Sequence, residues 1–490
     1  MALGHVFALA VGPSRGGTAV STRSSNTTRR GVIDCAVASS LTVENLRRLV
    51  EQGEIDTVVV AFTDMQGRLQ GKRCHAQFFL DDVLSHGSEG CSYLLATDVD
   101  METVSGYAMT SWDEGYSDFM LRPDLTTLRL VPWHPATALV SCDLAREDGS
   151  AVMTSPRQIL RRQIDRLAQH GLVAYAGTEL EFIVFQDTYE AAWTRRYQGM
   201  NPANQYNVDY SLLGTGRVEP LLRRIRNEMT GAGLVVESAK GECNLGQHEI
   251  AFKYDEALIT ADQHSVYKLG AKEIAAQEGM SLTFMAKYDE NEGNSCHIHL
   301  SVRSDDGTPV MAGNGVGNAE GFSPLMEQWL AGQLACLQEF SLLYAPNVNS
   351  YKRFVEGSFA PTTVAWGRDN RTCAIRVVGH GASLRAENRV PGGDVNPYLA
   401  LAGVIAAGLH GVENQLGLEP EFTGNAYLAD RPRMPSTLRE ATALFEGSAV
   451  ARAAFGDDVV NHYGHAAHAE QAVFDAAVTD WERVRGFERL

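Results

Sequence analysis

Basic residues are outnumbered in this chain of 490 residues, which has 42 lysines and arginines against 60 aspartates and glutamates. The formal net charge is therefore −18. Nonspecific binding to nucleic acid depends on cationic side chains that meet phosphates, so this balance argues against a nucleic-acid partner. An anionic small-molecule substrate would have to be held by local basic clusters.

Long hydrophobic runs and paired cysteines are also missing. The longest apolar run, Leu399 to Leu409, is shorter than the roughly 20 residues that cross a bilayer, so it predicts a buried helix and no membrane span. Eight cysteines are scattered without a Cys-x-x-Cys pair. This pattern favours reduced thiols in a cytoplasmic protein over a disulfide framework. The first twelve residues lack the basic stretch of a signal peptide.

The composition, 44% hydrophobic and 21% charged, allows a large core. Residues 1–40 are predicted to form a disordered extension, because residues 13–31 within it are rich in Ser, Thr, Gly and Arg. Ordered sequence begins near Leu41, where Thr42 can cap a helix over 43–51. We expect a small α+β domain over 41–149.

A hairpin is predicted early in this domain, with strands over 57–64 and 68–74 around a tight turn. Ser155-Pro156 opens an amphipathic helix. The boundary is placed just before it, which gives a second, larger domain over 150–490 that mixes hairpins and helices.

Charged residues recur at alternate positions in the larger domain. Alternate residues of an extended strand share one face, and a hairpin brings together the residues that flank its turn. Three strand faces and one hairpin result: Glu179 and Glu181; His297, His299 and Ser301; Arg385, Glu387 and Arg389; and Glu242 with Glu249.

Five carboxylates gathered in one cavity would repel one another and raise each other's pKa values. Two or three Mg²⁺ or Mn²⁺ ions would remove that cost, because carboxylate-rich sites favour hard cations over zinc. A loop over 349–361 and the segment after it add Arg353, Arg371 and Arg376, which can hold carboxylate or phosphate oxygens. Metals beside arginines suit phosphoryl transfer.

Six motifs resemble the glutamine synthetase family, in order, from about Leu41 to Leu490. They are Gly-Thr-Glu-Leu-Glu-Phe, Gly-Gln-His-Glu-Ile, Asn-Ser-Cys-His-Ile-His-Leu-Ser, Asn-Arg-Thr, Arg-x-Glu-x-Arg and Asn-Pro-Tyr. The resemblance implies an α+β fold with a β-grasp N-terminal domain and a catalytic domain built on a curved antiparallel sheet flanked by helices. It also implies a dodecamer of two hexameric rings, with each active site between neighbouring subunits.

The resemblance also implies residue roles. One metal would be held by Glu181, Glu242 and Glu249, and the other by Glu179, His297 and Glu387. The ATP co-substrate would meet Glu237, His299, Ser301, Arg376 and Arg385. Glutamate and the transferred phosphate would meet Gly293, Arg353, Arg371 and Arg389. The implied reaction passes through γ-glutamyl phosphate, which a nitrogen nucleophile then attacks.

The sequence departs from ammonia-using members at the nucleophile. Phe359 stands at the flap position where those members have glutamate, and Glu356 lies three residues earlier. The usual acidic motif of the N-terminal domain is missing, and Asp98 or Asp100 is the nearest candidate acid. A phenyl ring cannot deprotonate ammonium but can lie near a cationic amine.

We therefore expect a ligase that couples glutamate to an organic amine, such as a polyamine, ethanolamine or another alkylamine, in nitrogen metabolism. The chain also resembles the γ-glutamyl-amine ligases of the family. Two alternatives stay open. One is a true glutamine synthetase in which Phe359 only packs the flap. The other is a non-catalytic ring-forming relative.

Overall fold

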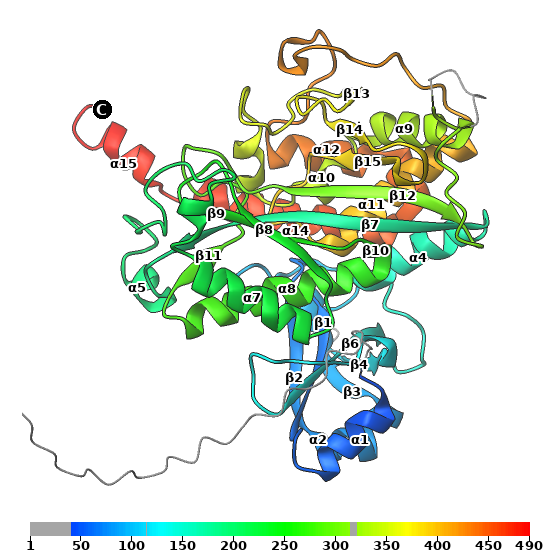
Figure 1. Ribbon diagram of the computed structural model, residues 1–490, viewed down its shortest axis with the longest axis vertical. Coiled ribbons are helices and arrows are strands. Elements are labelled where there is room, and N and C mark those ends of the chain that lie inside the picture. The colour runs from blue at the N-terminus through cyan, green and yellow to red at the C-terminus, as the bar shows by residue number, and fades with distance from the viewer. Residues whose placement is uncertain (1–40, 114, 314–320) are drawn as a thin grey trace, which may run out of the picture. The chain divides into compact units, whose positions relative to one another are not determined.

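The computed structural model describes residues 41–113, 115–313 and 321–490. The predicted extension over 1–40 lies outside these ranges. Two sheets organise the described chain (Figure 1). Among the described helices, none is long and apolar enough to cross a membrane.

The smaller sheet has strand order β2-β1-β6-β4-β3, with β5 paired to β6. Its first two strands form the predicted hairpin, antiparallel from Thr57–His75 to Thr63–Leu69. Helix α1 begins as predicted, because the Thr42 side chain accepts a hydrogen bond from the Asn45 backbone N–H at 3.1 Å. The elements are α1 Val43–Glu51, β1 Thr57–Thr63, β2 Leu69–His75, α2 Ala76–Phe78, α3 Leu84–His86, β3 Ser88–Cys91, β4 Asp118–Pro123, β5 Arg129–Leu130 and β6 Thr137–Ala145.

The larger sheet has strand order β13-β14-β15-β12-β7-β9-β8, with β10 and β11 both paired to β7. Its strands pair antiparallel, apart from the parallel pair β13–β14. Figure 1 shows the long strands β7 and β12 side by side. The strands are β7 Leu172–Phe185, β8 Val236–Gly241, β9 Gln247–Phe252, β10 Asp255–Glu256, β11 Ser281–Thr283, β12 Cys296–Ser304, β13 Trp366–Arg368, β14 Ile375–Val378 and β15 Arg385–Asn388.

Helices surround this sheet, and the apolar run predicted to be buried lies inside one of them, α11, whose leucines and alanines are almost fully buried. The predicted helix after Ser155 is α4. The helices are α4 Pro156–Ala168, α5 Tyr189–Thr194, α6 Leu212–Thr215, α7 Glu219–Gly231, α8 Ala257–Gln277, α9 Pro324–Cys336, α10 Ser341–Tyr344, α11 Pro397–Glu413, α12 Leu438–Gly447, α13 Ala449–Phe455, α14 Asp457–Ala476 and α15 Asp480–Gly486.

The tip of the β1–β2 hairpin packs against the start of α11. Asn396 donates its side-chain amide to the backbone carbonyls of Asp64 and Met65, both at 3.1 Å. Gly67 has φ +81°, and a Cβ there would lie 3.0 Å from the Asn396 Cα. Glycine therefore permits both the turn and the close approach. The smaller and larger sheets are joined by specific contacts, and the predicted division near residue 150 stays a prediction.

A buried arginine makes a second connection. Arg157, on α4, is 2% exposed and pairs with Asp124, which follows β4, with Asp143 of β6 and with Asp262 of α8, all within 2.8 Å. Burial disfavours the charge, but the hydrogen bonds and charge of Asp262 raise the pKa of Arg157 overall. The arginine therefore forms ion pairs with three carboxylates from different parts of the chain, two of which also pair with Arg161.

Arg157→Ala should lower the free energy of unfolding by about 3–5 kcal/mol, because it leaves the buried carboxylate of Asp262 without its ion-pair partner. Thermal and urea unfolding monitored by circular dichroism would measure the loss. Arg161→Ala is the matched control, since Arg161 pairs with two of the same carboxylates but its side chain is 32% exposed. We expect it to cost about 1 kcal/mol. Equal losses in the two variants would contradict this account of Arg157.

Candidate active site

Neighbouring strands of the larger sheet bring the predicted ligands together. Strand pairing sets Glu181 of β7 opposite Glu249 of β9. Glu179 of β7 lies opposite His297 of β12. His299 of β12 lies opposite Glu387 of β15. Two clusters result, in each of which one ligand atom per residue lies within 4.8 Å of the others: the first cluster is Glu181, Glu242 and Glu249, and the second cluster is Glu179, His299 and Glu387.

The first cluster contains the three residues predicted to hold one metal. Glu181 and Glu249 are buried, with exposed fractions of 8% and 5%. The Glu181 carboxylate accepts the Ser295 backbone N–H at 2.6 Å and the Gln247 side-chain amide at 3.2 Å. These donors hold the carboxylate in place and leave acceptor capacity for a cation.

Negative charge in the first cluster is poorly compensated. Burial, together with repulsion from Glu179, Glu181 and Glu387, raises the pKa of Glu249 to about 8, although Lys240 opposes the shift. Lys240 forms an ion pair with Glu242 and approaches Glu249 at 3.8 Å. A bound cation would favour the ionised form of this carboxyl group and so lower its pKa.

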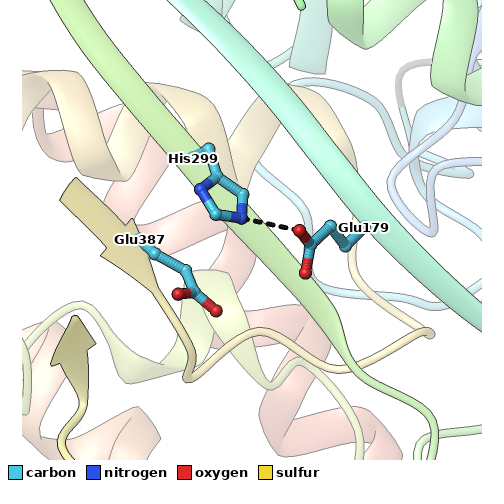
Figure 2. Close-up of side chains that lie close together, drawn as sticks. All are labelled: Glu179, His299 and Glu387. Atoms are coloured by element: carbon cyan, nitrogen blue, oxygen red, sulfur yellow. Dashed lines mark hydrogen bonds and ion pairs between the residues drawn. The ribbon is translucent and has the colours of Figure 1, made fainter. Parts of the chain in front are cut away.

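The second cluster contains Glu179 and Glu387, two of the three residues predicted to hold the other metal, together with His299 (Figure 2). The His299 Nε2 lies 3.0 Å from Glu179 Oε1. His297 remains adjacent, with its Nδ1 at 3.4 Å from Glu179 and 3.6 Å from Glu387. Its Nε2 is buried and has no hydrogen-bond partner among the described residues. The predicted roles of His297 in metal binding and His299 in ATP binding stay predictions.

These residues fit divalent metal ions. Each cluster has at least two carboxylates, and one ligand atom of each residue lies within 4.8 Å of the others. The His297 Nε2, which has no hydrogen-bond partner among the described residues, belongs to a ring beside the second cluster. Such oxygen-rich sets suit Mg²⁺ or Mn²⁺. A third group, Asp209, Glu242 and Cys243, is less suited, because burial and Asp209 raise the pKa of the Cys243 thiol to about 11, and the thiolate is the metal-binding form.

Arginines surround the second cluster. Glu387 is fully buried and forms ion pairs with Arg376, at 2.8 Å, and with Arg389. Burial opposes the charge of Glu387, yet His297 and these arginines hold its pKa below the usual value. Arg385 donates its Nε to the His299 Nδ1 at 3.1 Å. The other ring nitrogen, Nε2, is the one that faces Glu179.

Two residues predicted to bind glutamate contact the residues that orient Glu181: Arg353 donates to Ser295, and the Gly293 carbonyl accepts from Gln247. Arg353 is 2% exposed and donates to the carbonyls of Val390 and Arg389 and to the Ser295 hydroxyl. Burial lowers the pKa of Arg353 to about 10. A Cβ on Gly293 would lie 2.1 Å from the Ala286 carbonyl, so only glycine fits this position.

The remaining predicted residues are less buried than Glu181 and Glu249. Arg371 and Glu237 are exposed and make no ion pair with another described residue, and Ser301 is half-buried on β12. Phe359 is 53% exposed with φ +59°, and its carbonyl accepts from Arg389 at 3.4 Å. Glu356 forms an ion pair with Arg433 at 3.6 Å.

Asp98 is not beside these clusters. It lines a different cavity, whose lining includes none of the six predicted metal ligands.

Sequence reasoning gave no role to Gln247 and Ser295, which orient Glu181, or to Lys240, which lies between two carboxylates. The first two belong to motifs that carry the predicted ligands, and their position within those motifs could have indicated them. Lys240 and Glu242 are two residues apart, a spacing that would place both on one face of a strand. Glu242 lies just after the end of β8, however, so their contact depends on the backbone beyond the strand.

The pKa of Glu249 has a consequence for stability. Because its pKa in the folded protein is about 8 against an ordinary 4.5, the folded state binds more protons between these pH values. The contribution of Glu249 to the stability of the metal-free protein should therefore fall as pH rises through that window. Buried histidines act in the opposite direction, because burial lowers the pKa values of His248, His264 and His462, so the comparison is with Glu249→Gln. Relative to that variant, we expect EDTA-treated protein to lose roughly 5 °C of melting temperature from about pH 5 to about pH 8, and Mg²⁺ to restore most of it at the upper end. A difference in melting temperature that does not change with pH would contradict the assignment.

Comparison with known proteins identifies the family. The model of the glutamine synthetase catalytic domain matches residues 153–485, more than half of the chain. Together with the small sheet, the larger antiparallel sheet and the clusters it carries, this match defines a carbon–nitrogen ligase with a glutamine-synthetase-type fold, as predicted. The chain belongs to the glutamine synthetase family.

Particular relatives are close. Gamma-glutamylethanolamide synthetase GlnA4 of Streptomyces coelicolor is 69% identical over 450 residues, 92% of this chain and 96% of the relative. A glutamate–isopropylamine ligase of a Pseudomonas species is 38% identical, over 90% of this chain and 96% of the relative. The solved GmaS/ADP complex has a TM-score of 0.79 and 26% identity, and covers 90% of this chain and 99% of its own.

Proposed function

We propose that the protein joins the γ-carboxylate of L-glutamate to an organic amine at the expense of ATP, with ethanolamine as the first candidate. The observation that carries the proposal is the flap. By the resemblance to the family, Phe359 stands at the flap position that is glutamate in ammonia-using members. Glu356, the carboxylate of the loop over 349–361, forms an ion pair with Arg433. The name of the 69% identical relative supports ethanolamine as the nucleophile.

In the first step, a γ-carboxylate oxygen of glutamate attacks the γ-phosphorus of ATP, the bond to ADP breaks, and γ-glutamyl phosphate forms. Arg371, Arg376 and Arg389 are proposed to neutralise charge that develops on the transferred group. Magnesium ions held by the two clusters, with His297 beside the second, would supply further charge neutralisation when bound.

In the second step, the unprotonated amine attacks the γ-carbonyl carbon, the bond from that carbon to the phosphate oxygen breaks, and the nitrogen loses one proton, which leaves with phosphate as hydrogen phosphate, so that an amide forms. Phe359 is proposed to pack against the alkyl part of the amine. Ammonia has no alkyl part, so it would gain nothing from the phenyl surface, whereas each buried methylene contributes about 0.8 kcal/mol.

A complete site is proposed to require a ring, with a neighbouring subunit supplying Asp98 near the amine. Asp98 lies away from its own chain's clusters, which agrees with a role in another subunit's site. A dodecamer of two hexamers is the proposed assembly.

Phosphate release should be measured with glutamate, ATP, Mg²⁺ and a panel of nucleophiles: ethanolamine, isopropylamine, methylamine, 1,4-diaminobutane and ammonia. We expect ethanolamine to exceed ammonia in kcat/KM by at least about tenfold, which corresponds to about 1.4 kcal/mol of alkyl contact. If ammonia outperforms every organic amine, the protein is a glutamine synthetase in activity as well as in fold.

A further inference from the structure

A lysine contacts the carboxylates of the first cluster. Lys240, near the end of β8, forms an ion pair with Glu242, and its Nζ lies 3.8 Å from Glu249 Oε2. The two carboxylate side chains are only 13% and 6% exposed, whereas that of Lys240 is 26% exposed. The ammonium group therefore faces two of the three carboxylates predicted to hold one metal.

A second set of contacts is open to this ammonium group. The Lys240 Nζ lies 5.2 Å from the centre of the Tyr210 ring, a distance at which a cation is attracted to an aromatic face. The neighbouring residue, Asp209, is exposed and has a carboxylate oxygen within 4.8 Å of one in Glu242. A flexible side chain that already contacts Glu242 can therefore exchange it for Tyr210 and Asp209.

The backbone holds the tyrosine beside the lysine. A Cβ on Gly241 would lie 2.2 Å from the Val208 carbonyl oxygen, so glycine at this position allows the two segments to approach closely. Tyr210 donates its backbone N–H to the Gly241 carbonyl at 3.4 Å. The loop is also tied to α6 by the fully buried Asn204, whose side-chain amide donates to the Gly214 carbonyl at 2.9 Å. The ring is therefore a fixed surface next to a mobile ammonium group.

An ammonium group and a divalent cation compete for these carboxylate oxygens. In the metal-free protein, the Lys240 charge offsets the mutual repulsion of Glu242 and Glu249 and so stabilises that state. In the metal-bound protein, the same charge stands close to a cation and repels it. Both effects lower the affinity of the first cluster for a divalent cation.

We propose that Lys240 is a tethered counter-ion of the first cluster, which a divalent cation displaces towards Tyr210 and Asp209 when it binds. Lys240 thereby sets the Mg²⁺ concentration at which the first cluster fills. The inference rests on the metal site of the proposed function and adds a residue that tunes this site. It does not depend on which amine reacts.

Calorimetric titration of Mn²⁺ into the metal-free full chain tests the proposal. Lys240→Met removes the charge and keeps a side chain of similar length. We expect this variant to bind Mn²⁺ at least about fivefold more tightly than the wild type, at the site that Glu249→Gln weakens. Lys253→Met is the matched control, because Lys253 is exposed and directly follows β9, the strand that carries Glu249. It should change the affinity less than about twofold.

Lys240→Arg separates the charge from the shape of the side chain. Arginine keeps the positive charge, so this variant should bind Mn²⁺ more weakly than Lys240→Met. Equally tight binding in the two variants would show that the charge is not the cause and would overturn the proposal. Binding to Lys240→Met that is no tighter than binding to the wild type would also overturn it.

The melting temperature provides a readout without metal. EDTA-treated Lys240→Met should melt at least about 2 °C below the wild type, because two carboxylates lose their counter-charge, and saturating Mg²⁺ should remove most of the difference. An equal melting temperature without metal would contradict the role of Lys240 alone. Failure of the wild-type protein to bind Mn²⁺ would instead refute the metal site, and with it both this inference and the metal-dependent step of the proposed function.

Discussion

Glu249→Gln should reduce kcat/KM at least about 1,000-fold, because it removes an anionic ligand from a site whose charge stabilisation accounts for several kcal/mol of the barrier. Glu249 is 5% exposed and lies within 4.8 Å of Glu181 and Glu242. The amide keeps the size of the side chain, so the fold should be retained. The same variant should bind Mn²⁺ at least about tenfold more weakly in a calorimetric titration.

Stability provides an independent readout for this variant. The metal-free protein should become more stable near pH 8, because glutamine removes a carboxyl group that burial and its neighbours disfavour as an anion. Glu256→Gln, at an exposed position of the adjoining strand β10, is the control and should leave activity and metal binding unchanged. Full activity in Glu249→Gln would remove this residue from the metal site.

Phe359→Glu should raise the ratio of kcat/KM for ammonia to that for ethanolamine by at least about tenfold. A carboxylate can accept hydrogen bonds from ammonium and take its proton, whereas the phenyl ring offers only apolar contact. Both side chains occupy the same left-handed backbone conformation, φ +59°, so the exchange adds little strain. Initial rates with each nucleophile at fixed glutamate and ATP would give the ratio.

Val355→Glu places the same charge on the same flap, at a residue that is 49% exposed. It should leave the ratio unchanged, which separates a local effect at Phe359 from a general effect of charge. An unchanged ratio in Phe359→Glu would reduce Phe359 to a packing residue and remove the main structural argument for an organic amine.

Local patterns predicted much of this site. The period of two along a strand correctly grouped Glu179 with Glu181 and His297 with His299, because side-chain direction in a strand depends only on sequence position. The hairpin around residues 244–247 was predictable for a similar reason, since its turn and flanking residues are contiguous. Interactions between residues close in sequence therefore predict which side chains share a face of a strand and where the chain turns.

Such patterns do not predict which distant strands pair or in which register they pair. Register between β12 and β15 sets His299, rather than His297, opposite Glu387, and no periodicity within either strand determines that choice. The buried position of Arg157 depends on Asp262, which is 105 residues away. The cavity that contains Asp98 and Glu470 likewise exists only after the smaller sheet has packed against α14.

The central claim is that this site activates glutamate as an acyl phosphate for an organic amine. One competition experiment tests it most directly: glutamate labelled with ¹⁸O in its γ-carboxylate, ATP, Mg²⁺, and equal concentrations of ethanolamine and ammonia, with products analysed by mass spectrometry. The account predicts mainly γ-glutamylethanolamide, with one ¹⁸O transferred to each phosphate released. Predominant glutamine, or phosphate free of ¹⁸O, would contradict it.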